Sequence, residues 1–176
     1  MNRALVLTWM LGALLCAGCD QAAPTVASTT PTAPSIPGLP TQAQGKLQTM
    51  KLYIGANEMV TELALTPLQQ ETGMMFRTNM DENAGMLFPL PYTRQASFWM
   101  MNCPYPLSAA YISEDGVIQE IHDLQPYNTN AVVSAGDNIR FVLETPQGWF
   151  ARHHVGTNVA IATERGPLME TFFGRR

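Results

Sequence analysis

Three polar side chains stand inside otherwise apolar motifs and are the first candidates for chemistry. Arg77 follows "GMMF", Asn102 follows "FWMM" and Glu144 follows "FVL". Burying a polar group costs free energy unless it is paired, so polar residues in apolar surroundings say more about function than their neighbours do. Each of the three lies at or near the end of an apolar segment, and we therefore expect them to gather at one end of a sheet.

Two arrangements of these residues remain open. In the first, Arg77 and Glu144 form a structural ion pair and Asn102 bonds to the backbone of the loop 103–106. Breaking such a pair would cost roughly 3–5 kcal/mol, because it leaves a buried charge without its partner. In the second, Arg77 binds an anionic or carbonyl group of a ligand in a cleft floored by Trp99, and its replacement would cost little stability.

The stretch "SFWMMNCPYPL", residues 97–107, also has two interpretations. Alternation gives it two mostly apolar faces, which is expected of a central strand covered on both sides. Asn102 would end this strand, and Pro104 forbids its continuation. The alternative is a ligand groove lined by Trp99, Asn102 and Tyr105.

Methionine is abundant enough to suggest a soft-metal site. The chain has 11 methionines, including the doublets Met74-Met75 and Met100-Met101, and thioethers favour Cu(I). Adjacent residues on a strand point to opposite faces, however, so one doublet cannot line one site without an irregularity. Methionine also fills irregular cores well. We interpret these residues as core and predict no metal and no cofactor.

Cys103 is the one thiol expected in the mature domain, so we expect no disulfide within it. The candidate bases for a nucleophilic thiol are His122, His153 and His154, but nothing in the sequence places one of them beside Cys103. We expect a small, partly buried residue at a strand end. Serine-hydrolase, phosphate-loop and metalloprotease motifs are absent from the sequence, and no catalytic residue is assigned.

The composition narrows the class of partner. Of the 176 residues, 46% are hydrophobic and only 14% are charged, which is apolar enough to fill a core. The net charge is −4 and the basic residues are scattered. Nucleic acid is therefore not an expected partner, because neutralising phosphates needs clustered cations. We expect a monomer with a small-molecule or protein ligand.

The N-terminus has the order of a secretory signal peptide over residues 1–18. One positive charge, an apolar run over 4–15 and the small pair at 17–18 precede Cys19. The run is shorter than the roughly 20 apolar residues of a membrane span. Small residues directly before a cysteine resemble the bacterial lipobox, which implies lipidation of Cys19 and a membrane anchor in the periplasm. Asp20 favours the inner over the outer membrane. The alternative is cleavage near residues 17–18 and a soluble secreted protein.

Behind Cys19, the composition divides the chain into a tether, one domain and a tail. Residues 19–45 comprise the lipid-anchor cysteine and a segment rich in Pro, Thr and Ala, which is typical of a disordered spacer. Residues 46–163 form one globular domain, and residues 164–176 are a C-terminal tail.

The elements of this domain read as mostly strand. Turn signals at 55–57 and 114–116 predict two hairpins, and further apolar strands are predicted at 85–90, 96–102, 138–145 and 158–162. A capping box at Thr66 and Gln69 predicts a short helix that ends near Gly73, and residues 146–154 predict a second. This pattern indicates an α+β, mostly β fold with a curled, largely antiparallel, barrel-like sheet and two short helices.

Three segments then make the chain recognisable over about residues 58–162: "GMMFRTNMDENAGMLFPL", "SFWMMNCPYPLSAAYISEDGVI" and "FVLETPQGWFARHHVGTNV". Together they resemble the bacterial and archaeal family called domain of unknown function 192. The sequence departs from the family pattern at Met101, Cys103 and Ser108, where lysine, threonine and aspartate are common. A site that uses those polar residues in relatives is altered or absent in this chain. The resemblance implies a compact β-rich fold and no established activity.

These observations predict a membrane-tethered periplasmic lipoprotein whose domain is a binding or interaction module. The candidate ligand-binding residues are Arg77, Trp99, Asn102, Tyr105 and Glu144. The alternative is a small hydrolase or transferase with a site near Arg77, Asn102 and Glu144.

Overall fold

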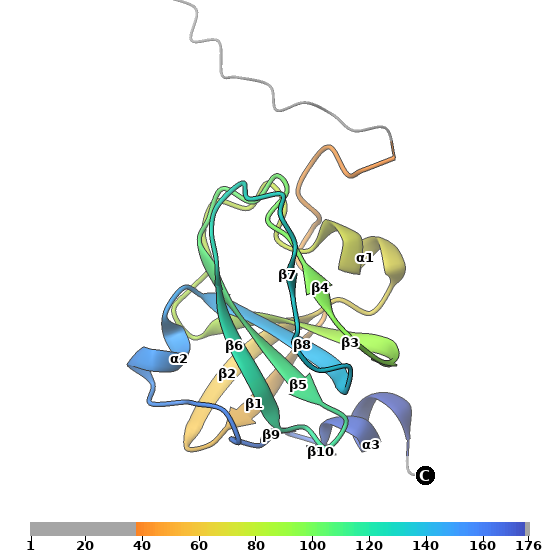
Figure 1. Ribbon diagram of the computed structural model, residues 1–176, viewed down its shortest axis with the longest axis vertical. Helices are drawn as coiled ribbons and strands as arrows, with labels where there is room; N and C mark the ends of the chain where they lie inside the picture. Colours follow the sequence, from red (N-terminus) through yellow and green to blue (C-terminus); the bar gives the residue numbers. More distant parts are fainter. Residues whose placement is uncertain (1–37, 175–176) are drawn as a thin grey trace, which may run out of the picture. The chain divides into compact units, whose positions relative to one another are not determined.

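The computed structural model describes residues 38–174, and the signal-peptide and Cys19 predictions fall outside that range. The described part is mostly β: an eight-stranded sheet curls into a half-barrel, accompanied by a two-stranded sheet and three short helices (Figure 1). The strand order of the large sheet is β10-β9-β1-β2-β3-β8-β5-β6. All pairs in it are antiparallel except β2 with β3, which are parallel. The predicted fold class is confirmed.

The strands and helices follow one another along the chain with short connections. The first half comprises β1 (Thr49–Ile54), β2 (Asn57–Leu63), α1 (Pro67–Thr72), β3 (Ala84–Arg94), β4 (Ser97–Phe98), β5 (Leu107–Ser113) and β6 (Ile118–Leu124). The second half comprises β7 (Val132–Val133), β8 (Ile139–Pro146), α2 (Trp149–Arg152), β9 (Ile161–Thr163), β10 (Gly166–Pro167) and α3 (Leu168–Phe173). Both predicted hairpins are confirmed, as β1-β2 and β5-β6.

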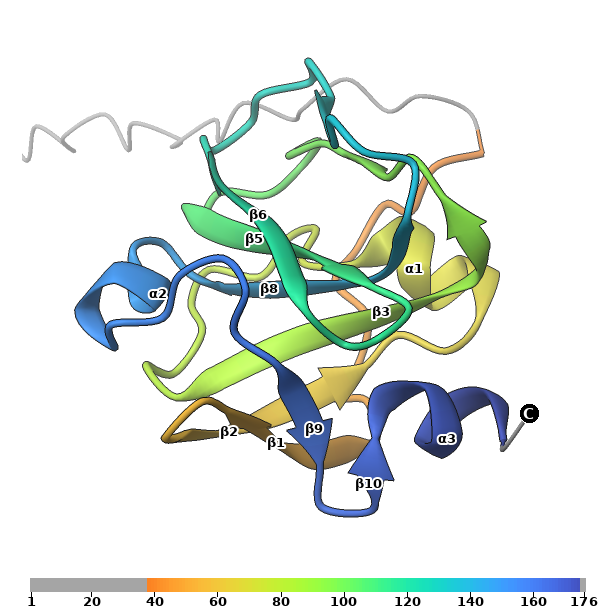
Figure 2. The same ribbon diagram turned by 60° about the horizontal axis from the view of Figure 1, so that its bottom comes forward.

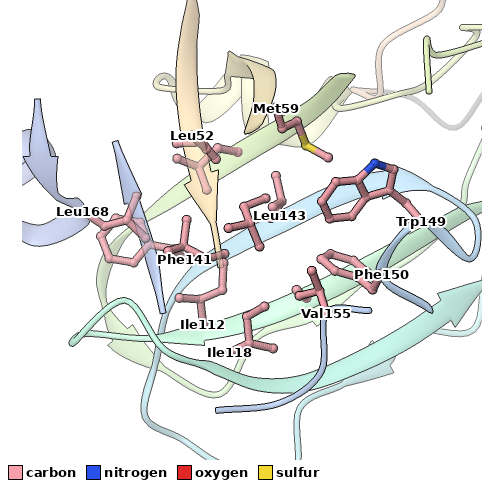
Figure 3. Packing of buried hydrophobic residues seen from close by; sticks show 14 of the residues in the cluster. Leu52, Met59, Ile112, Ile118, Phe141, Leu143, Trp149, Phe150, Val155 and Leu168 are labelled. Atoms are coloured by element: carbon pink, nitrogen blue, oxygen red, sulfur yellow. The ribbon is translucent and has the colours of Figure 1, made fainter. Parts of the chain in front are cut away.

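The concave side of the sheet holds one of two apolar clusters of similar size (Figure 3). Trp149 and Phe150 of α2 enter this cluster beside Leu143 of β8, and both aromatic side chains are at most 2% exposed. The far edges of the sheet also approach each other, since an isolated bridge joins Val117 to Ala160. Curling lets one sheet enclose a core on its own inner face.

The other face of the sheet carries the second apolar cluster, which α1 and the β4-β7 pair cover (Figure 1). The predicted capping box is confirmed at α1: the Gln69 backbone N–H donates to Thr66 Oγ1, and the Gln69 side chain accepts from the Thr66 backbone N–H. Gln70 fastens the helix to the sheet by donating from its side-chain amide to the carbonyls of Ala64 and Pro89, at 3.0 and 2.8 Å. This second face is where the candidate site lies.

Two segments that the sequence assigned to tether and tail contact the domain. Gln44 donates to the carbonyls of Gln69 and Gly73 at the end of α1. At the other end of the chain, the segment 166–173 forms β10 and α3, which lie beside β9 (Figure 2). Phe172 and Phe173 of α3 approach Phe141 with ring centroids 6.0 and 5.8 Å away. The third helix was not predicted, because a six-residue helix with only one buried residue has almost no periodic signal.

The prediction of a central strand over residues 96–102 is wrong. Pairing there is limited to Ser97 and Phe98, which form β4 opposite β7. The chain then turns, with hydrogen bonds from Cys103 N to the Met100 carbonyl and from Met100 N to the Asn128 carbonyl. Two apolar faces mark a segment covered on both sides, and a turn buried among other loops gives the same pattern as a central strand.

Candidate functional site

A pocket of about 240 Å³ opens on the second face of the sheet. The end of α1 and the turn after it form one wall, and β3 and β4 form another. Glu144 of β8 lies at its inner end with 4% of the residue exposed, whereas Trp99 at its rim is 38% exposed. Half of the lining residues are apolar or sulfur-bearing, namely Met74, Met75, Phe88, Leu90, Phe98, Trp99 and Cys103.

The carboxyl group of Glu144 has no hydrogen-bond partner among the described residues at Oε2, which is fully buried. Removal from water disfavours the charged form and raises the pKa of Glu144 to about 8. At neutral pH the group is therefore mainly a neutral acid, with one O–H to donate and lone pairs to accept. An unsatisfied group of this kind typically costs about 1–3 kcal/mol, which a ligand that supplies the missing partner would recover.

The position of Glu144 follows from strand alternation and one irregularity. On β8, Val142 shares its face with Glu144, as alternation along a strand requires, and Glu144 pairs with Met86 of β3 and Ala109 of β5. Strict alternation would place Arg140 on this face too, but the structure does not. The pairing with β5 skips Arg140, and its guanidinium lies 3.7 Å from the Phe173 ring centroid, on the side of the first cluster. A bulge reverses alternation at one residue, which sequence periodicity does not reveal.

Glycine at position 85 lets β3 approach β8 directly beside Glu144. A Cβ atom there would lie 2.7 Å from Met59 Sδ and 2.9 Å from the Glu144 carbonyl oxygen. Both distances are too short for ordinary contact, so a side chain at this position would separate the two strands. The glycine in "GMLF" thus serves packing and not a turn.

Asn102 has a backbone role in the wall of the site. It adopts a φ of 55°, and its carbonyl accepts a 2.7 Å hydrogen bond from the N–H of Phe76, which has a φ of 61°. Asparagine is among the residues that tolerate this left-handed region best. The bond ties the turn after α1 to the loop after β4. The prediction that Asn102 bonds to the loop 103–106 is wrong: among the described residues its side chain makes no bond to that loop, and the Cys103 carbonyl accepts from the Tyr127 N–H.

Arg77 belongs to a second pocket, of about 580 Å³, that shares Met74 with the Glu144 pocket. Its guanidinium makes a bidentate ion pair with Glu62 of β2, at 2.7 and 2.9 Å, and also donates to the Gly45 carbonyl. Partial burial opposes the charged form of Glu62, but the bonds from Arg77 and from the Leu47 N–H hold the pKa of Glu62 below its usual value. The predicted pair of Arg77 with Glu144 is wrong. Glu62 has no distinctive sequence context, since it is one of several acidic residues on alternating strand faces.

Cys103 lies in the wall of the Glu144 pocket as a free, buried thiol that is 5% exposed. Burial, together with the nearby Glu144 charge, raises the pKa of Cys103 to about 12. Because the thiolate is the nucleophile, a thiol held in its protonated form reacts slowly. Cys103 is buried more fully than expected, and it lies in the loop between β4 and β5 and not at a strand end.

The structure therefore divides the five predicted ligand-binding residues. Trp99 and Glu144 line one pocket, and Arg77 lines the adjacent one. Asn102 joins the loop after β4 to the turn after α1 through its backbone carbonyl. Tyr105 is partly buried against the second cluster. The interpretation of Met74 and Met75 as core is confirmed, since both are buried in the second cluster, but they also line the pocket, which the sequence did not indicate.

A family profile matches residues 50–162 of the chain and carries the description "Uncharacterized ACR". The chain belongs to the domain of unknown function 192 (DUF192) family. None of the curated proteins gives a significant match. The DUF192 match covers all of the strands that build the Glu144 pocket, together with α1 and the loop after β4.

Two solved structures resemble this DUF192 chain, each at 28% sequence identity. One is described as a candidate transcription regulator from Sinorhizobium meliloti; it superposes with a TM-score of 0.65 and covers 69% of this chain and 98% of its own. The other is a protein of unknown function from Novosphingobium aromaticivorans, with a TM-score of 0.61 and a coverage of 73% of this chain and 91% of its own.

Two further features are missing from residues 38–174. No helix in that range has the length and apolar character to span a membrane. Within the same residues, no three His, Cys, Asp or Glu side chains lie close enough together to hold a metal ion.

Proposed function

We propose that this DUF192 protein is a lipoprotein of the bacterial cell envelope whose domain binds a small ligand in the Glu144 pocket. The observation that carries the binding role is the combination of a pocket with an aromatic and thioether wall and one buried carboxyl oxygen without a partner at its inner end. Ligand sites are typically concave and mostly apolar, with a few placed polar groups that fix the orientation of the ligand.

A hydrolase or transferase is supported less well than a binding module. Such an activity was expected to join Arg77, Asn102 and Glu144, but Glu62 and the Gly45 carbonyl hold the Arg77 side chain, and Asn102 acts through its backbone. The thiol in the pocket is held protonated, which opposes nucleophilic catalysis.

The binding role is tested by closing the mouth of the pocket. Ser97 on β4 is exposed and lines the pocket, while its direct cross-strand partner Val133 on β7 is exposed and does not line it. A panel of small aromatic fragments is screened against the full-length chain by ligand-observed NMR. Ser97→Trp is expected to abolish the fragment signals, and Val133→Trp is expected to retain them. Equal binding by both variants, or no binding by the unaltered chain, overturns the proposal.

The envelope location rests on the sequence before Cys19 alone. The expected chemistry is thioether attachment of a diacylglycerol to Cys19, which supports stable anchoring because more than one acyl chain is present. Expressed in a bacterium, the chain should incorporate radioactive palmitate and partition into detergent, and Cys19→Ala should lose both properties. Equal labelling of the Cys19→Ala variant contradicts the anchor, and recovery of that variant from the medium or periplasm in soluble form supports it.

A further inference from the structure

The Glu144 pocket has a feature that points to the chemistry of its ligand. Resting on the proposed function, we infer that the ligand is a small organic cation: an apolar or aromatic body that carries a protonated amine. The body would occupy the apolar part of the pocket, and the ammonium group would pair with the carboxylate of Glu144 at its inner end.

The first support is the contrast between Glu144 and the other buried or paired glutamates. Glu62 has Arg77 at 2.7 Å, Glu82 has Arg152 at 2.9 Å, and Glu58 has Lys51 at 2.8 Å. Glu144 is the most deeply buried carboxylate of this group, and no described cation pairs with it. A buried acid without a protein partner is well placed to receive a partner that arrives from outside.

The second support is the character of the walls. Phe88 and Phe98 meet edge to face with centroids 5.1 Å apart, and Trp99 stands at the rim. Aromatic faces carry a negative electrostatic potential that attracts ammonium groups, most strongly when the group is desolvated. The thioethers of Met74 and Met75 add polarisable, weakly accepting surface. Apart from the exposed Arg94, the lining contains no positively charged side chain, so the aromatic and thioether wall beside Glu144 suits a cation better than an anion.

None of the other charged or titratable groups near Glu144 serves as a cationic partner for its carboxylate. Glu71 at the end of α1 and Arg94 at the end of β3 both line the pocket but are exposed, and their charges are opposite. Two further titratable groups lie close to Glu144: the thiol of Cys103, in the loop before β5, and the hydroxyl of Tyr111, on β5. Burial raises the pKa of both groups, and the charge of Glu144 adds to the shift. They remain neutral over the physiological range. An ammonium group that enters the pocket would thus ionise Glu144 alone and release its proton to solvent.

The size of the pocket limits the body of the ligand. A cavity of about 150 Å³ holds a benzene molecule, and this pocket has about 240 Å³. A benzene ring with a two-carbon chain and one terminal nitrogen is therefore a suitable probe. 2-Phenylethylamine is the cationic member of a matched series, in which 2-phenylethanol is neutral and phenylacetate is anionic.

The experiment measures the affinity of the full-length chain for the three probes by isothermal titration calorimetry at pH 6, 7 and 8. We expect the amine to bind at least tenfold more tightly than the alcohol at pH 8, and the anion not to bind. Affinity for the amine should rise with pH, because binding below the pKa of Glu144 releases a proton, while the alkylammonium itself stays protonated. Titrations in two buffers with different ionisation enthalpies should show release of up to one proton per amine bound.

Two variants, each replacing one glutamate of the pocket lining by glutamine, test whether Glu144 in particular binds the amine. Glu144→Gln should reduce the amine affinity at least tenfold and remove its pH dependence, with alcohol binding retained. Glu71→Gln removes one negative charge at the rim of the same pocket and should change the amine affinity less than threefold. A thermal melt of each variant confirms that it is folded.

The outcomes separate this inference from the proposed function. If the alcohol binds as tightly as the amine, or if Glu71→Gln weakens the amine as much as Glu144→Gln, the pocket binds ligands but the cationic inference fails. If tight binding of phenylacetate is found, the inference also fails. If no probe binds and the fragment screen is negative as well, both the inference and the proposed function fail.

Discussion

Glu62 and Glu144 are two glutamates of the same sheet that lie in neighbouring pockets sharing Met74. Their surroundings shift the pKa values of the two carboxyl groups in opposite directions. Glu62 accepts from both terminal nitrogens of Arg77 and from the Leu47 N–H, and its pKa is lowered. Glu144 is more deeply buried, and its pKa is raised to about 8. Burial alone therefore does not make a carboxylate structural. What distinguishes the two carboxylates is a cationic partner, and of the two only Glu62 has one within the described part of the chain.

The largest effect is expected at Glu144 itself. Its folded pKa of about 8 lies above the ordinary 4.5, so as pH rises the unfolded chain loses its proton first. Stability is therefore lost between about pH 4.5 and 8, and the slope ends once the folded form also ionises. Glu144→Gln lacks this loss and should be more stable by roughly 3 kcal/mol at pH 7. Denaturant unfolding of both proteins measures the difference.

The pH dependence supplies the control for that prediction. Well below pH 4.5, Glu144 is mainly protonated in both the folded and the unfolded state, so the advantage of the variant should nearly disappear. A constant difference across this pH range would show that the substitution acts through packing and not through ionisation.

Breaking the Glu62 side of the comparison should have the opposite sign. Arg77→Met removes two charge-assisted bonds to a half-buried carboxylate, and it should destabilise the domain by about 2 kcal/mol. A double-mutant cycle of Arg77→Met with Glu62→Gln should show clear coupling. The effects of Arg77→Met and Glu144→Gln should be additive. Strong coupling between them would instead support an ion pair of Arg77 with Glu144, which the structure does not contain.

A smaller effect is expected at the helix that covers the Glu144 pocket. Thr66→Ala removes the N-cap bond to the Gln69 N–H and should cost about 1 kcal/mol. The lost bond lies in α1, which provides Gln70 and Glu71 to the pocket lining. Hydrogen exchange in α1 should therefore accelerate more than in β2, the strand that carries Glu62. Uniform acceleration over both regions would mean that α1 does not open independently of the sheet.

The smallest effect is expected at an ion pair on the surface of the sheet. Lys51 and Glu58 join β1 to β2 at 2.8 Å, but both side chains are largely in solvent. Lys51→Met should leave the melting temperature unchanged within error, because solvent screens such pairs and ordering two long side chains offsets the attraction. A clear loss of stability here would undermine the distinction between exposed and half-buried pairs on which the comparison depends.

The sequence predicted local elements well and the candidate site only in part. Turn chemistry and the capping box indicated both hairpins and α1, because these signals lie within a few neighbouring residues. The motif "FWMMN" was assigned to a strand, since apolar residues in a buried turn show no different pattern. Glu144 does lie in apolar surroundings, as its sequence context indicated, whereas Arg77 lies among polar groups and pairs with Glu62, a partner that the sequence did not reveal.

The mostly β fold, the family and the positions of unusual polar residues follow from the amino-acid sequence alone, because composition, periodicity and motifs are properties of nearby positions. The tertiary structure decided which charges meet. Arg77 lies 15 positions from Glu62, and the two meet because β2 pairs in parallel with β3 and the turn after α1 returns over β2. Glu144 is left alone because a bulge turns Arg140 to the opposite face of β8. Pairing over such separations depends on register and strand irregularity, which single-sequence patterns do not specify.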